Sequence, residues 1–140
     1  MNEGALANLL DGLCNNKALK KFIGAVNKLN NQHMECIGHS IQNDTALKEL
    51  DLNQCDIDDE EAAHLTKCFS GSRLENLCLS LNSIGDHDCG SLLSSIPPTL
   101  KKLAITGNQI TESSLQTILT SNRTLKIFWM NVNPVFGEDY

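Results

Sequence analysis

Apolar residues recur at fixed offsets along most of the chain. The clearest copy of the pattern is Leu47-x-x-Leu50-x-Leu52-x-x-Cys55-x-Ile57. Further copies begin at Leu19, Leu74, Leu100 and Leu125, so successive starts are 28, 27, 26 and 25 residues apart. The alternation of apolar and polar residues at the centre of each copy is typical of a strand with one buried face. The spacing therefore predicts a tandem array of strand-containing units.

The ninth position of each copy carries a small polar residue. The residues there are Asn27, Cys55, Asn82, Asn108 and Asn133. An asparagine amide can both donate to and accept from backbone groups that lack a partner at a bend. The asparagines are therefore expected to stack as a ladder, with the small Cys55 thiol as an exception that tolerates burial.

Helical periodicity fills the intervals between the copies. Apolar residues at helical spacing predict helices over 3–17, 31–42, 59–69 and 86–95, and one after Thr111. Asn30 is expected to cap the second helix, and Asp58 with Glu61 is expected to form a capping box at the third. Strands are expected within 19–26 and 125–132.

The alternation of an eleven-residue strand segment with a full helix resembles the ribonuclease-inhibitor-like class of leucine-rich repeats. That class includes the sensor domains of NOD-like receptors, and similar short arrays occur in injected bacterial effectors. The resemblance spans about Leu6 to Val135. It implies an α/β fold, a right-handed leucine-rich repeat solenoid with parallel β-strands on the concave face and α-helices on the convex face. It also implies protein binding on the concave face and no chemistry.

The whole of 1–140 is expected to be one domain. A partial unit at 3–18 precedes units that begin at 19, 47, 74 and 100, and a terminal strand lies within 125–140. The strand at Leu19–Val26 would be an edge strand, which invites pairing with another chain. The edge therefore predicts either a homodimer through the N-terminal end or further residues before this segment in the natural protein.

Composition narrows the choice of partner and compartment. The apolar fraction of 41% is enough for a core, and the net charge of -6 argues against a sequence-independent nucleic-acid binder. No apolar run has membrane-spanning length, and the first residues lack the basic region of a signal peptide. The six cysteines are spread singly, so they are expected to be reduced small hydrophobes in the cytoplasm, or in the host cytosol for an effector.

No pattern indicates an enzyme, a metal site or a cofactor. His33, His39, His64 and His87 do not have the spacing of metal ligands and are expected on solvated helix faces. Cys78 occupies an outward strand position, in a column with Ile23, Asp51, Ala104 and Trp129. Because no histidine shares that column, Cys78 has no base to activate it as a nucleophile.

Two other outward columns hold six of the eleven basic residues. They read Lys20, Lys48, Glu75, Lys101, Lys126 and Lys21, Glu49, Asn76, Lys102, Ile127. One interpretation is a set of solvated strand edges. The other is a partly basic rim that steers an acidic protein partner.

Trp129, the single tryptophan, is expected to face the concave side next to the small Ala104. It is interpreted either as a cap on the last coil or as an anchor for a partner. The candidate partner-binding residues are Lys48, Asp51, Asn53, Cys78, Ser80, Lys102, Thr106, Trp129 and Asn131. The sequence thus favours a noncatalytic protein-protein interaction module. The alternative is the substrate-targeting part of a larger ubiquitin ligase or of an injected bacterial effector.

Overall fold

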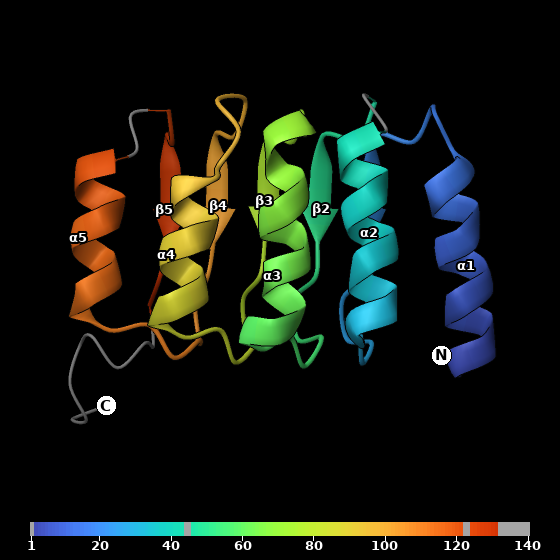
Figure 1. Ribbon diagram of the computed structural model, residues 1–140, viewed down its shortest axis with the longest axis horizontal. Helices are drawn as coiled ribbons and strands as arrows, with labels where there is room; N and C mark the ends of the chain where they lie inside the picture. The colour runs from blue at the N-terminus through green and yellow to red at the C-terminus, as the bar shows by residue number, and fades with distance from the viewer. Residues whose placement is uncertain (1, 44–45, 122–123, 132–140) are drawn as a thin grey trace.

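Helices and strands alternate along the chain in the computed structural model, which describes residues 2–43, 46–121 and 124–131 (Figure 1). The helices are α1 Glu3–Asn15, α2 Asn31–Asn43, α3 Asp59–Cys68, α4 Asp86–Ser94 and α5 Glu112–Ser121, and a 3-10 turn, Phe69–Gly71, follows α3. The strands are β1 Lys21–Ile23, β2 Glu49–Asp51, β3 Asn76–Cys78, β4 Lys102–Ala104 and β5 Ile127–Trp129.

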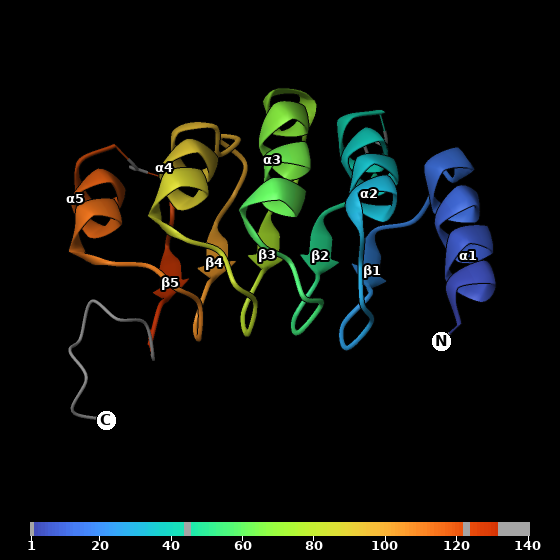
Figure 2. The same cartoon turned by 60° about the horizontal axis from the view of Figure 1, so that its bottom comes forward.

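The strands form one parallel sheet in sequence order, β1 to β5. The central residues of the strands lie opposite one another, namely Phe22, Leu50, Leu77, Leu103 and Phe128. The helices form a single layer on one face of the sheet, and α1 lies beyond β1 at the end of this layer (Figure 2). We call the opposite face the open face. The register and the α/β architecture expected from the sequence are therefore confirmed.

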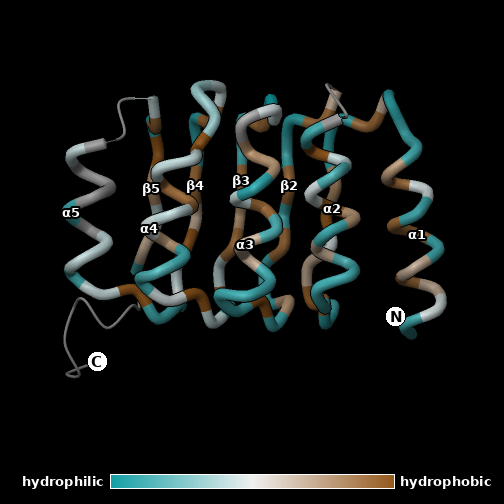
Figure 3. The backbone as a smooth tube through the Cα atoms, in the orientation of Figure 1, coloured by the Kyte–Doolittle hydropathy of each residue, from teal (hydrophilic) through white to brown (hydrophobic). Residues whose placement is uncertain are grey.

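The core lies between the sheet and the helix layer. The inward residues Leu50, Leu77 and Leu103 are at most 2% exposed. The tube in Figure 3 shows hydrophobic segments recurring in the strands and on the helices that pack against them. The four apolar positions of the Leu47 copy are all buried, as are those of the copies at Leu74 and Leu100. Apolar burial at all four positions of these three copies explains why their units stack.

The turn after each of the first four strands contains a residue with left-handed backbone geometry at the same place, and the turn after β2 contains a second one, Asp56, with a φ angle of 55°. Val26, Gln54, Leu81 and Gly107 have φ angles of 61°, 54°, 55° and 69°, and they occupy the same position in successive copies. The N–H of each donates to the carbonyl of a residue in the next copy, at 2.8–2.9 Å. These hydrogen bonds hold a conformation that is unfavourable for a β-branched residue such as Val26.

The asparagine ladder is confirmed where the structure describes it. Asn82 Oδ1 accepts from the N–H groups of Cys55 and Ile57, both at 3.0 Å. Its Nδ2 donates to the carbonyls of Leu52 and Leu79, also at 3.0 Å. Asn108 repeats the arrangement with the N–H of Ile84 and the Leu79 and Ile105 carbonyls, whereas Asn27 donates to the Gly24 and Ala25 carbonyls of its own turn. Asn133 lies outside the described residues.

The helix starts also follow the sequence. Asp58 and Glu61 form the expected capping box at α3. The Asn30 side chain accepts a hydrogen bond from the His33 N–H at 3.0 Å, as expected for α2. The strands are shorter than expected, because ladder pairing gives way to the left-handed turn soon after the third residue of each strand.

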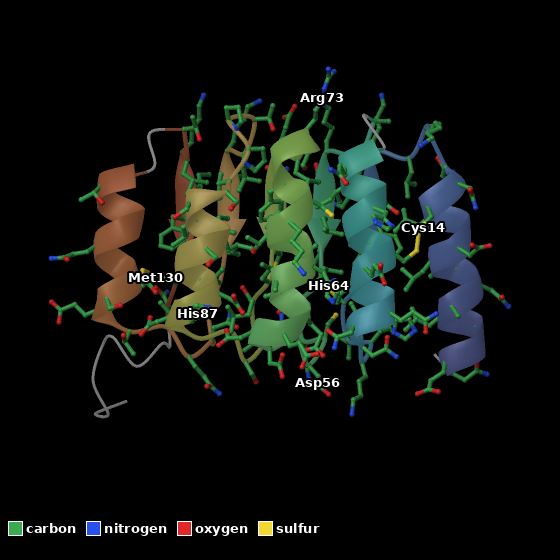
Figure 4. The ribbon with its side chains drawn as sticks, in the orientation of Figure 1. Cys14, Asp56, His64, Arg73, His87 and Met130 are labelled. Carbon is green, nitrogen blue, oxygen red and sulfur yellow. A yellow bond between two sulfur atoms is a disulfide. The ribbon has the colours of Figure 1, made fainter. Side chains whose placement is uncertain are left out.

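Two expectations about single residues are wrong. Cys14 of α1 and Cys36 of α2 form a disulfide, because α1 packs directly against α2 and brings the two sulfur atoms together (Figure 4). Cys55, Cys68, Cys78 and Cys89 are free. His33 is buried at 8% exposure, because it lies on the side of α2 that faces α1, where its Nδ1 accepts from the Asn30 N–H. His39 and His87 are exposed and His64 is half-buried.

Candidate protein-binding surface

A shallow hollow of about 390 Å³ lies on the open face of the sheet and is lined by residues of all five strands, with Trp129 contributed by β5. It is lined by Lys21, Phe22, Glu49, Leu50, Asp51, Asn76, Leu77, Cys78, Lys102, Ala104 and Trp129. Most of these residues are the outward first and third residues of the strands, since successive side chains of a strand point to opposite faces. We call this surface the open-face hollow.

Four of the nine residues predicted from the sequence line the open-face hollow. They are Asp51, Cys78, Lys102 and Trp129. Lys48 is not among the lining residues; it precedes β2, and its ammonium group lies 3.7 Å from the Glu75 carboxylate. Asn53, Ser80, Thr106 and Asn131 lie past the strand ends, where their carbonyls accept the hydrogen bonds that hold the left-handed turns. These four are therefore structural residues of the turns as well as surface residues.

The list from the sequence missed three polar residues of the hollow. Lys21, Glu49 and Asn76 begin β1, β2 and β3 and all line it. The signal that could have found them was present, since they share an outward column with Lys102.

Ion pairs neutralise part of the expected basic rim. Lys21 lies 2.9 Å from the Glu49 carboxylate, and hydrogen bonding to Lys21 holds the pKa of Glu49 below its usual value. Lys101 lies 3.1 Å from Glu75, and this hydrogen bond lowers the pKa of Glu75. The rim therefore carries both signs of charge, with Lys102 exposed within the hollow.

Trp129 is the most prominent apolar group of this surface. It is 46% exposed and lies in register with Ala104, which in turn lies in register with Cys78. Because these two neighbours have small side chains, the indole projects beyond them on the open face. A half-exposed aromatic ring with a polar tip is typical of residues that anchor a protein interface.

The acidic cluster at the start of α3 has a structural role. Asp58 accepts from the N–H groups of Glu60 and Glu61 within the capping box. Asp59 accepts from the Gly85 N–H of the next unit at 2.7 Å. The carboxylates thus satisfy backbone donors at helix starts, where negative charge is stabilising.

Within the described ranges, no group of three or more His, Cys, Asp or Glu side chains could hold a metal ion. None of the helices in the part of the chain that the structure describes is long and apolar enough to span a membrane. The arrangement on the open face offers contact area, one aromatic ring and mixed charge.

Comparison with known proteins shows similarity at the level of the fold. No protein-family model matches the sequence, and no curated protein matches it. A solved structure of the leiomodin-1 actin-binding site 2 (ABS2) has a TM-score of 0.76 and 17% identity, over 89% of this chain and 78% of that chain. The tropomodulin C-terminal domain of Caenorhabditis elegans has a TM-score of 0.76 and 14% identity, over 90% of this chain and 82% of that chain.

These similarities correct the family expected from the sequence. The assignment to ribonuclease-inhibitor-like leucine-rich repeats is wrong, because the similar solved structures are of the leiomodin and tropomodulin kind. The interpretations as part of a ubiquitin ligase or of an injected effector receive no support from either structure. The α/β chain, with its five-stranded parallel sheet, shares its fold with the leiomodin-1 and tropomodulin domains.

Proposed function

We propose that this chain is a noncatalytic protein-binding module that holds a protein partner on the open face of its sheet. The observation that carries the proposal is the position of Trp129. A large aromatic side chain is 46% exposed at one end of the open-face hollow, where burial against the core would have been more favourable. An aromatic residue held in this way gains contact area only when a partner covers it.

The lining of the hollow defines the chemistry of the partner surface. Ala104 and Cys78 line the hollow next to Trp129 with small side chains, Lys102 lies on the neighbouring strand, and Asp51 adds the opposite charge three strands away. A partner that inserts an apolar side chain next to Trp129 and places a carboxylate near Lys102 would complement this surface.

Actin is the first candidate partner. One of the solved structures with this fold bears the name of an actin-binding site, that of leiomodin-1. This chain covers 78% of that structure, so the comparison includes most of the named domain. The proposal for actin rests on the shared fold together with the exposed, mixed polar and aromatic open face.

The Trp129→Ala variant tests the anchor. Binding to purified actin is measured by co-sedimentation and by fluorescence anisotropy, with the melting temperature measured on the same protein. Loss of the anchor should weaken binding by about 2 kcal/mol, roughly 30-fold, with little change in the melting temperature. Leu81→Ala is the matched control, because Leu81 is a large apolar residue, 53% exposed, outside the hollow.

The opposite pattern would favour the interpretation of Trp129 as a cap on the last coil. A lower melting temperature of Trp129→Ala with unchanged affinity means that the indole stabilises the last strand instead of a complex. Absence of binding by the unmodified chain, to both monomeric and filamentous actin, rejects actin as the partner.

A further inference from the structure

The edge of the sheet at β1 presents unpaired backbone groups. β1 pairs with β2 on one side, and in the described part of the chain no strand pairs with its other side. The N–H groups of Gly24 and Val26 donate to Asp51 and Asn53 of the neighbouring copy. Because backbone groups of a strand alternate in direction, Ile23 and Ala25 direct their N–H groups away from β2. An edge of this kind accepts an additional strand.

An apolar groove lies directly beside this edge, between β1 and α1. It has a volume of about 320 Å³ and is lined by Asn8, Leu9, Gly12, Leu13, Asn16, Leu19 and Phe22. Leu9 is 45% exposed although it lies on a helix whose other leucines are buried. The groove lies where the inward side chains of a strand next to β1 would pack. Behind the neighbouring strands, the equivalent positions are filled by core leucines.

The charge around the edge is strongly one-sided. The segment 16–34 contains four lysines and no aspartate or glutamate, although the chain as a whole has a net charge of -6, and one of these lysines, Lys21, is paired with Glu49 of β2. Lys17 and Lys20 precede β1 and Lys28 follows it, all three exposed. None of the residues that line the groove is acidic. The positive charge therefore brackets the unpaired strand at both ends.

We infer that the β1 edge and the adjacent groove form a second interface, which takes an extended, acidic segment of a partner protein as an added strand. Alternate apolar side chains of this segment enter the groove against Leu9 and Phe22. Its backbone pairs with the outward groups of Ile23 and Ala25. Its carboxylates lie near Lys20 and Lys28, where opposite charge accelerates and orients association.

Charge decides between this occupant and a second copy of the chain. Pairing of two β1 edges would bring two sets of Lys17, Lys20 and Lys28 close together. Like charges in such positions oppose association. An acidic apolar strand meets the same backbone groups and the same groove with favourable electrostatics.

A synthetic peptide serves as the test probe. It has ten residues, alternates leucine and phenylalanine with aspartate and glutamate, and carries a fluorescent label for anisotropy measurements on the full chain. Binding by the unmodified protein is expected, and N-methylation of alternate peptide amides should weaken it at least about tenfold, because methylation removes backbone hydrogen bonds. No binding, or equal binding of the methylated peptide, overturns the inference.

Two pairs of variants locate the site. Gly12→Leu places an apolar side chain in the groove, since Gly12 lines it and no atom lies within 4 Å of an added Cβ, and leucine favours the helix. Gly90→Leu in α4 is the matched control, because it is equally open and lies outside the groove. The double variant Lys20→Glu, Lys28→Glu should lower affinity about tenfold, whereas Lys126→Glu, at the far end of the sheet, should leave it unchanged.

A last measurement determines the oligomeric state of the chain without peptide. Sedimentation of the unmodified chain should show either no self-association or a self-association that Gly12→Leu leaves unchanged. A dimer that Gly12→Leu abolishes would mean that a second copy occupies the edge, and would overturn the assignment to an acidic segment. Equal peptide affinity for Gly12→Leu and Gly90→Leu would show that the groove is not used.

Discussion

Replacement of Asn82 by alanine gives the most direct test of how the units are joined. Asn82 is 8% exposed, and its side chain makes hydrogen bonds to both its own turn and the preceding one. The Asn82→Ala variant leaves the N–H groups of Cys55 and Ile57 buried without a partner. The Leu79 carbonyl keeps a donor in Asn108, whereas the Leu52 carbonyl loses the Asn82 amide.

The expected loss of stability follows from the number of buried N–H groups that lose their partner. Each buried N–H that loses its partner costs about 1–3 kcal/mol, so the two together lower the free energy of unfolding by about 2–6 kcal/mol. Cys55→Ala should cost less, because a thiol is a weak donor and its contact with the Gly24 carbonyl is at 3.3 Å. Asn27→Ala is the matched control, since this half-buried asparagine serves the carbonyls of its own turn.

Urea unfolding followed by circular dichroism measures all three variants against the unmodified chain. The comparison requires an unchanged slope with denaturant, because a changed slope would indicate loss of cooperative unfolding. If Asn82→Ala loses no more stability than Cys55→Ala or Asn27→Ala, the asparagine does not join the units and the argument fails.

Three further predictions concern the core, one turn and one carboxylate. Leu103→Ala should lower the free energy of unfolding by about 2–5 kcal/mol, because Leu103 is fully buried; a loss below about 0.5 kcal/mol in urea unfolding would contradict the strand register. Val26→Gly should raise stability by up to about 1 kcal/mol, because relief of the left-handed φ of 61° outweighs the added entropy of the unfolded chain; Ala25→Gly should lower it, and a fall for both would refute the reasoning. Burial raises the pKa of Asp86, but hydrogen bonds from Thr111 and Ser114 outweigh this and lower it overall. A lowered folded-state pKa contributes stability above the unfolded pKa, so the deficit of Asp86→Ala should be largest near neutral pH and shrink below about pH 4 in a pH series of melting temperatures.

The fold was largely predictable from the sequence because one signal recurs. The leucines at matching positions share one environment, and each copy reinforces the register of the next, as with Leu50 opposite Leu77. The ends of the strands were less predictable, because the left-handed residue that stops pairing is a different amino acid in each copy, such as Val26 and Gln54.

The surface was predictable only in part. Alternation correctly placed Trp129, Cys78 and Asp51 on one face, because side-chain direction in a strand depends on the register alone. The Cys14–Cys36 disulfide depends on how α1 packs against α2, and no spacing in the sequence encodes that contact. The family was misassigned because the apolar pattern reports how units stack, and different families share that requirement.

The asparagine ladder gives the array a direction that matters during protein synthesis. The side chain of Asn82 completes the turn of the preceding unit, and Asn108 does the same through the Ile84 N–H. A ribosome releases the N-terminal units first, so each turn emerges before the residue that completes it. A nascent chain that ends before Asn82 or Asn108 thus carries an unfinished turn, which the next unit completes.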